Sequence, residues 1–116
     1  MKQNEHKLQV GCVAWFRYSY PKHLIFAIPN GGQRNTIVAS KMKTEGVLAG
    51  VPDLCIPVAR DGFHGLYVEL KTGKNKLTQN QQHIIQKLQN EGYKCEICYS
   101  FDDFVFLVNN YLKIER

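Results

Sequence analysis

The chain of 116 residues has the length of one domain, so we expect residues 1–116 to form a single folding unit. Hydrophobic residues make up 44% and charged residues 22%, which excludes disorder along the whole chain. No apolar run reaches the roughly 20 residues that span a bilayer, and the charged N-terminus is not followed by a secretory core. The sequence therefore predicts a folded protein with no membrane partner, outside the secretory route.

The positive charge is concentrated in one half of the chain. Residues 1–50 hold seven Lys or Arg residues against two acids, whereas residues 51–116 hold eight of each, and the net charge is +5. Such asymmetry is typical of a basic surface that faces a polyanion, although it also occurs in soluble domains without such a partner.

Four cysteines could form two disulfides in a secreted protein, but their spacing matches no disulfide-rich scaffold. Cys95 and Cys98 form a C-x-x-C motif inside an alternating run, where their side chains should point to opposite faces of a sheet. A zinc site needs a second pair of ligands, and a redox motif needs a helix N-terminus. We expect reduced, packed thiols, with metal or redox chemistry as the alternative.

The first half of the chain predicts two helices and one strand. A helix should run from Asn4 as its cap to about Tyr18, and the apolar run 24–28 reads as a buried strand that enters a tight loop. Asn35 or Thr36 can cap a second short helix that ends at Gly46.

The next two strands are the clearest elements of the sequence. Segment 53–58 alternates so that Asp53 lies opposite its apolar face, and segment 66–71 alternates strictly. The turn-rich residues 60–65 between them favour an antiparallel hairpin.

The last third of the chain adds a helix, a strand and a helix. Thr78 and Gln81 match a capping box at the start of a helix that stops before Gly92. Segment 93–99 alternates as a strand, and Ser100 can cap a final helix with an apolar stripe. The expected order is α-β-α-β-β-α-β-α, a mixed α/β domain with a central mixed sheet flanked by helices.

Two carboxylates and a lysine should converge on one side of the hairpin. Asp53 begins one strand, and Glu69 and Lys71 lie two residues apart on the other, so the three can share a face. Paired carboxylates with open positions suit Mg²⁺ or Mn²⁺, and a nearby lysine could orient a water or neutralise charge on a phosphate. The alternative is a solvated strand face with an ordinary Glu–Lys pattern.

These residues resemble a known nuclease signature. Pro52-Asp53, fifteen residues and then Glu69-Leu70-Lys71 is similar to the motif of the PD-(D/E)XK superfamily. The motif alone is short enough to recur by chance, so its flanking segments matter.

The flanking segments resemble the VRR-NUC branch of that superfamily, in its phage-type members. The similar stretches are Glu45–Leu54, Val68–Thr72, Leu77–Gln81, Gly92–Cys95 and, on the first helix, Glu5–Gln9. The resemblance covers nearly the whole chain and implies a restriction-endonuclease-like αβββαβ core, which fits the expected order of elements.

The resemblance also implies roles for individual residues. Asp53, Glu69 and the main-chain carbonyl of Leu70 would bind Mg²⁺ or Mn²⁺, and Lys71 would be the catalytic lysine. Gln81 would face the site from the start of its helix and take part in catalysis by positioning water or the metal, and Glu5 would complete the acidic cluster as a metal ligand or as a group that supports the ligands. The plain alternatives are a capping side chain for Gln81 and a helix-dipole acid for Glu5.

The implied activity is a divalent-metal-dependent endonuclease that hydrolyses DNA phosphodiesters, selective for branched DNA such as four-way junctions or flaps. The family resemblance favours a homodimer, no small-molecule cofactor and a cytoplasmic setting in a bacterial or phage-infected cell. The basic residues placed to hold DNA phosphates are Arg34, Lys41, Lys43, Lys74 and Lys76. We expect His64 and His83 to be loop and helix-surface residues rather than catalytic bases.

Three other functions are compatible with the sequence. A nucleic-acid-binding module of the same fold would bind DNA without cutting it. A zinc or redox protein would use Cys95 and Cys98 and leave the acidic face unexplained. A restriction-type enzyme with a fixed recognition sequence ranks below structure-selective cutting, since little chain is left over for reading bases.

Overall fold

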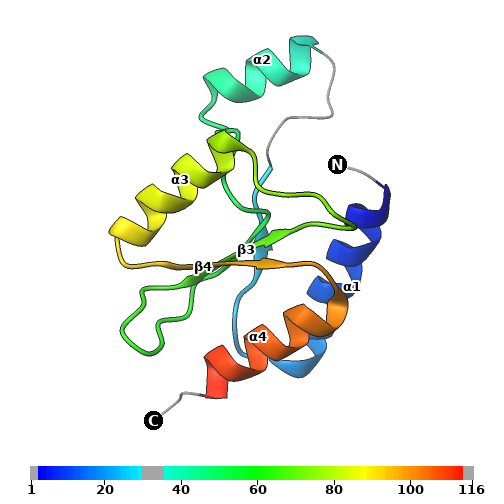
Figure 1. Cartoon of the computed structure of the whole chain (residues 1–116), viewed down its shortest axis with the longest axis vertical. Coiled ribbons are helices and arrows are strands. Elements are labelled where there is room, and N and C mark those ends of the chain that lie inside the picture. Colours follow the sequence, from blue (N-terminus) through cyan, green and yellow to red (C-terminus); the bar gives the residue numbers. More distant parts are fainter. Residues whose placement is uncertain (1–2, 30–35, 114–116) are drawn as a thin grey trace.

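The computed structural model describes residues 3–29 and 36–113, and it contains the eight elements in the expected order (Figure 1). Their bounds are α1 Gln3–Ser19, β1 Phe26–Ala27, α2 Thr36–Thr44, β2 Leu54–Ile56, β3 Leu66–Leu70, α3 Gln79–Asn90, β4 Lys94–Cys98 and α4 Phe101–Lys113. Among these described residues, no helix is long and apolar enough to cross a membrane.

The four strands form one mixed sheet in the order β1-β2-β3-β4. β1 and β2 are antiparallel, as are β2 and β3, whereas β3 and β4 are parallel and are joined through α3. The predicted hairpin is confirmed by the pairing of Cys55 with Tyr67, and Tyr67 in turn pairs with Cys95. The mixed sheet flanked by helices confirms the predicted fold class.

One face of the sheet carries the hydrophobic core. Leu54 and Ile56 on β2 and Leu66, Val68 and Leu70 on β3 are fully buried. They pack against α1 and α4, which also contact each other. The core side chains from these two helices are Cys12, Phe16, Phe104, Val108, Tyr111 and Leu112.

The opposite face is covered by α3, which packs along β4 (Figure 1). The sheet is thus a middle layer between the α1–α4 pair and α3. α2 extends away from these layers in Figure 1, and it has no buried side chain. The expected short helix is present and ends at Thr44, two residues before Gly46, and Thr36 is its first helical residue rather than its cap, while Asn35 lies outside the described residues.

The prediction of a buried strand over residues 24–28 is wrong. Only Phe26 and Ala27 form the strand, and both are exposed, although Ile25 points into the core. β1 is an edge strand in the described sheet, and residues of α1 lie beside Ala27. The apolar run therefore predicted the presence of a strand correctly, but it did not predict that the strand is exposed.

The predicted helix caps are confirmed on the C-terminal side of the chain. Thr78 and Gln81 form the complete capping box, and the Ser100 Oγ accepts the amide of Asp103 at 3.0 Å. The apolar stripe of α4 departs from the expected helical pattern at both ends of the helix, because Phe101 is 40% exposed and Tyr111 is buried. At the N-terminus, Asn4 lies inside the first turn rather than at the cap position.

Candidate active site

The register of the central hairpin places the two predicted carboxylates opposite each other. Leu54 pairs with Val68, so the next antiparallel positions are Asp53 at the start of β2 and Glu69 near the end of β3. Both point to the face opposite the core, and they are 7% and 4% exposed. Two acids are rarely buried side by side without a compensating cation, so this pair is the first indication of a functional site.

Main-chain contacts hold Asp53 in place. Its Oδ2 accepts the amide of Leu70 at 2.8 Å, so β3 fixes the orientation of the carboxylate on β2. The loop before Asp53 is fixed as well, because the Asn80 Nδ2 donates to the carbonyl of Ala49 at 3.0 Å.

Gly50 in this loop has a φ of +96°, and a Cβ there would lie 2.6 Å from the Asn80 side chain. Only glycine fits both the backbone conformation and this contact. The segment 50–53 therefore lies close against α3 at Gly50.

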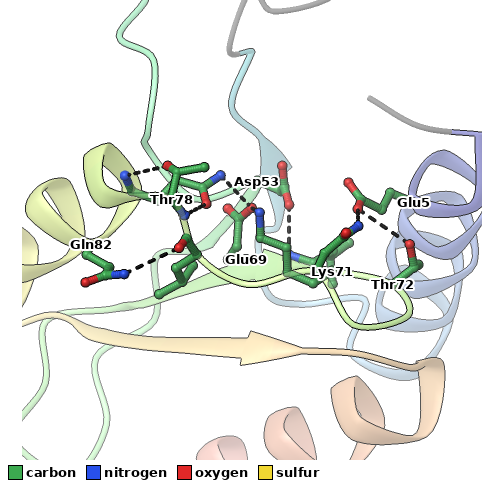
Figure 2. Close-up of polar contacts among 11 residues, drawn as sticks. Glu5, Asp53, Glu69, Lys71, Thr72, Thr78 and Gln82 are labelled. Atoms are coloured by element: carbon green, nitrogen blue, oxygen red, sulfur yellow. Dashed lines mark hydrogen bonds and ion pairs between the residues drawn. The ribbon is translucent and has the colours of Figure 1, made fainter.

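Lys71 brings a positive charge to the carboxylate pair. Its Nζ lies 3.5 Å from the Glu69 Oε2, and the residue is 8% exposed. Its amide donates to the Cys98 carbonyl at 3.0 Å, which ties the end of β3 to β4. Figure 2 shows Lys71 beside Asp53 and Glu69 on the same side of the sheet, as the alternation of β3 predicts.

Gln81 connects the start of α3 to the site. Its Oε1 accepts the amide of Thr78 at 2.9 Å in the capping box, while its Nε2 donates to the Glu69 Oε2 at 3.1 Å. The amide group therefore caps the helix and contacts a candidate catalytic carboxylate at the same time (Figure 2). The two roles that the sequence suggests for Gln81, a helix-capping side chain and a residue that faces the site, are therefore compatible.

Burial and neighbouring negative charge raise the pKa of both carboxylates. Burial, and next the charge of Asp53, raise the pKa of Glu69 from 4.5 to about 7, against the opposing effect of Lys71. Burial also raises the pKa of Asp53, while its hydrogen bond from Leu70 works in the other direction. A site with this electrostatic character binds a cation favourably.

Glu5 lies beside the pair but is held by the loop that follows β3. Its Oε2 accepts hydrogen bonds from the Asn75 Nδ2 at 3.2 Å and from the Thr72 hydroxyl at 3.5 Å (Figure 2). The negative charge of Glu5 raises the pKa of both Asp53 and Glu69. Its contacts are to the loop, and within the described residues it does not join Asp53 and Glu69 in a cluster that could hold a metal.

The donor set fits a hard divalent cation held by two carboxylates. In the described ranges no three His, Cys, Asp or Glu side chains form a cluster that could hold a metal. Asp53 and Glu69 would therefore be its side-chain ligands, and further positions would be open to main-chain oxygen, water and phosphate. The Leu70 carbonyl lies between Glu69 and Lys71 in sequence and stays a predicted ligand.

The basic residues predicted to hold phosphates fall in two places. Lys74 and Lys76 are exposed in the loop after β3, on either side of Asn75, which contacts Glu5. Lys41 and Lys43 are exposed on the projecting α2. Arg34 lies outside the described residues.

The four cysteines are free thiols, and their surroundings oppose thiolate chemistry. Burial raises the pKa of Cys98 to about 12 and that of Cys95 to about 11. Cys98 belongs to the core, while Cys95 pairs with Tyr67 and points to the α3 side. The C-x-x-C spacing thus produces two thiols on opposite faces, as predicted.

The two histidines predicted as surface residues are exposed. His83 lies on α3, and the ring of His64 packs edge-on against Tyr93, with centroids 5.9 Å apart. Asp53, Glu69 and Lys71 remain the titratable groups that converge at the hairpin.

Sequence reasoning missed three supporting side chains of the site. Thr72 and Asn75 hold Glu5, and Asn80 holds the loop before Asp53. Their signal was weak, because short polar residues after a strand or at a helix start usually serve local turns. What selects them here is the approach of segments 31 to 70 residues apart in sequence, which no local pattern encodes.

The comparisons with known proteins agree with the predicted fold and family. A solved structure described as a "VRR_NUC domain protein" is similar, with a TM-score of 0.79 and 28% identity over 98% of this chain and 92% of that chain. A second, described as "VRR_NUC domain", has a TM-score of 0.63 at 18% identity, over 95% and 99%, and supports the fold alone. No curated protein matches the sequence. The sequence profile of the VRR-NUC domain matches residues 2–102, so the chain belongs to the VRR-NUC domain family, a nuclease-type family.

Proposed function

We propose that the protein is a divalent-metal-dependent endonuclease that hydrolyses DNA phosphodiester bonds. The observation that carries the proposal is the buried pair of Asp53 and Glu69 with Lys71 beside it. A purely structural role would leave two weak, mutually repelling acids buried at a loss of stability. A bound cation would offset that repulsion, and it could also take a phosphate oxygen as a further ligand.

Asp53, Glu69 and the Leu70 carbonyl would hold Mg²⁺ or Mn²⁺. When bound, such a cation lowers the pKa of a coordinated water and neutralises charge on the phosphate in the transition state. The chain itself supplies the orientation, since the amide of Leu70 and the side chain of Gln81 fix the two carboxylates.

Lys71 would act on the water and the scissile phosphate. Its ammonium group is close enough to Glu69 to share the site, and its burial makes its charge effective over a short distance. It would orient the attacking water or stabilise the extra negative charge of the pentacovalent state. Glu5 would tune the acidic pair through its charge.

We propose DNA with branched structure, such as four-way junctions or flaps, as the preferred substrate over plain duplex. This preference follows the family resemblance, and it favours a homodimer, because two-fold substrates are cut symmetrically by paired sites. Lys74 and Lys76 lie where they could hold phosphates next to the site.

The test is cleavage of labelled four-way junction, flap, duplex and single-stranded DNA in Mg²⁺, Mn²⁺ and EDTA. Wild type would be compared with Asp53→Asn and Lys71→Ala, which should lose at least about a hundredfold in rate. Lys94→Ala is the matched control, since Lys94 pairs with Glu96 at 3.1 Å on the opposite face. Light scattering at working concentration would test the dimer.

Metal-dependent cutting by wild type and Lys94→Ala, lost in the other two variants, would support the proposed nuclease. A folded wild-type protein that binds DNA equally in EDTA and Mg²⁺ and cuts none of the substrates would instead identify a binding module. Cutting that survives Lys71→Ala unchanged would contradict the role given to the lysine.

A further inference from the structure

Two parallel rows of side chains cross the α3 side of the sheet. The strand registers place Phe26, Cys55, Tyr67 and Cys95 in one row. The next row contains Asp53 and Glu69, each two residues away from the first row along its own segment. The amide of Ile28, which directly follows β1, donates to the Asp53 carbonyl at 2.8 Å. Two residues along a strand span about 6.6 Å, so the distance between the rows is about that of two base steps along a nucleic acid strand, at about 3.4 Å each.

Phe26 occupies the open end of the first row. It is 47% exposed, and Leu24 before it is 69% exposed, whereas Ile25 between them is buried. The other members of the row lie deeper, since Cys55 is buried and Tyr67 is half-buried. An aromatic ring thus stands at the edge of the sheet on the same side as the carboxylates, and the pale blue ribbon of β1 passes beside Asp53 in Figure 2.

The charge around β1 points to an anionic partner. Between Glu5 and Glu45 the sequence has no Asp or Glu but has six Lys or Arg residues. In the structure, the Arg17 guanidinium donates to the Ile25 carbonyl at 3.4 Å from the α1 side of β1, and Lys22 is exposed nearby in sequence. A second copy of this chain would bring the same positive segment to this face, and like charges would repel.

A partner with both flat apolar faces and regular negative charge is a nucleic acid strand with unpaired bases. Aromatic side chains stack on such bases, and neighbouring cations contact the phosphates. In a duplex the bases are already stacked and paired, so an edge aromatic gains little from them.

We propose that Phe26 stacks on an unpaired base of the DNA strand close to the scissile phosphate, and so selects substrates with bases free of the duplex. The proposal rests on the proposed nuclease function and deepens it by naming a residue that sets substrate choice. Leu24 extends the apolar surface of the stacking site.

The test measures affinity in EDTA, so that it does not depend on cleavage. Fluorescence anisotropy would compare single-stranded DNA, a flap and a fully paired duplex of equal length. Phe26→Ala should weaken binding to the first two about tenfold, the scale of removing one base–aromatic stack, and leave duplex affinity unchanged. Phe26→Trp should retain the preference, because an indole also stacks.

Phe106→Ala is the matched control, since Phe106 is 72% exposed on α4, outside both rows. It should change neither affinity. The proposal is overturned if Phe26→Ala lowers both affinities equally, or neither, or if Phe106→Ala has the same effect. A fall from dimer to monomer in light scattering on Phe26→Ala, with single-strand preference intact, would also overturn it and identify Phe26 as a contact between copies.

Cleavage in Mg²⁺ then separates the two proposals. If wild type cuts and Phe26→Ala loses the preference in both binding and cleavage, both proposals stand. If no variant cuts but Phe26→Ala still loses single-strand affinity, the base contact stands and the nuclease proposal fails.

Discussion

Asp53 and Glu69 show how a single residue can oppose the stability of the fold that positions it. Both carboxylates are buried, and burial together with neighbouring negative charge, from Glu5 for Asp53 and from Asp53 and Glu5 for Glu69, makes ionisation unfavourable. The hydrogen bonds from Leu70 and Gln81 orient them without removing that conflict. The consequence is a pH dependence and a mutational response opposite to those of ordinary surface acids.

The first prediction concerns the pH dependence of stability without divalent cations. Because the pKa of Glu69 rises from 4.5 to about 7 on folding, the folded state binds the proton more tightly than the unfolded state. The free energy of unfolding in EDTA should therefore fall as pH rises from about 4.5 to 7, by about 3 kcal/mol at most. Urea denaturation followed by circular dichroism at several pH values measures it.

In that experiment, Glu69→Gln should show a flatter profile over the same pH range. Under the proposed metal binding, added Mg²⁺ should raise the melting temperature more at pH 8 than at pH 5. A wild-type profile that rises between pH 5 and 7 would contradict this account of Glu69.

The second prediction separates the charge of Asp53 from its hydrogen bond. Asp53→Asn keeps an acceptor for the Leu70 amide and removes the repulsion with Glu69, so stability at pH 8 in EDTA should equal or exceed wild type. Asp53→Ala leaves that buried amide unpaired and should be about 1–3 kcal/mol less stable than Asp53→Asn. Urea midpoints compare the two, and equal stability would show that the hydrogen bond contributes little.

At the scale of elements, α3 does more than cover the sheet. Its first turn supplies the capping box, the Gln81 contact with Glu69 and the Asn80 contact with the loop before Asp53. α2, by contrast, has no buried side chain, and its charged residues are Lys41 and Lys43. The position of the carboxylates therefore depends on how closely α3 approaches Gly50.

The third prediction tests that approach with two glycines of similar backbone conformation. Gly50→Ala must accommodate a Cβ 2.6 Å from Asn80 and 3.0 Å from Ile84, and should cost about 2 kcal/mol or more. Gly46→Ala, at a φ of +110° with open space around it, should cost about 1 kcal/mol from backbone strain alone. Thermal unfolding measures both, and equal losses would show that the contact with α3 is readily relieved.

At the scale of the whole molecule, charge is distributed in keeping with a polyanionic substrate. Lys74 and Lys76 flank the residue that holds Glu5, while Lys41 and Lys43 lie on the projecting helix. The positive groups closest to the acidic pair should therefore contribute most to DNA binding.

The fourth prediction concerns the salt dependence of DNA affinity. Lys74→Gln with Lys76→Gln should weaken binding and lower the slope of log affinity against log salt by about 0.9 for each phosphate that the variant no longer neutralises. The same change at Lys41 and Lys43 should have a smaller effect, and Lys87→Gln on the outer part of α3 should have none. Unchanged affinity and slope in all variants would contradict a phosphate-binding role for these lysines.

The whole fold also shows which features a sequence can predict. Alternation predicted β2, β3 and β4, and capping residues predicted the start of α3, because these signals are local. The exposure of Phe26 was missed, since a run of apolar residues does not say whether its strand lies at an edge. Likewise, Asn75 contacts Glu5 across 70 residues of sequence, and only the packed structure brings them together.

The hairpin between β2 and β3 has a further consequence for engineering. Asp53 and Glu69 lie at the open ends of the two strands, so the connecting segment 57–65 turns at the far end, about three residues of strand away from both. A peptide tag or fluorophore inserted there would lengthen a turn without shifting the strand register. A single-residue deletion inside β2 or β3, by contrast, would turn one carboxylate toward the hydrophobic core. The turn end of the hairpin is thus suited to labelling, whereas its other end carries Asp53 and Glu69.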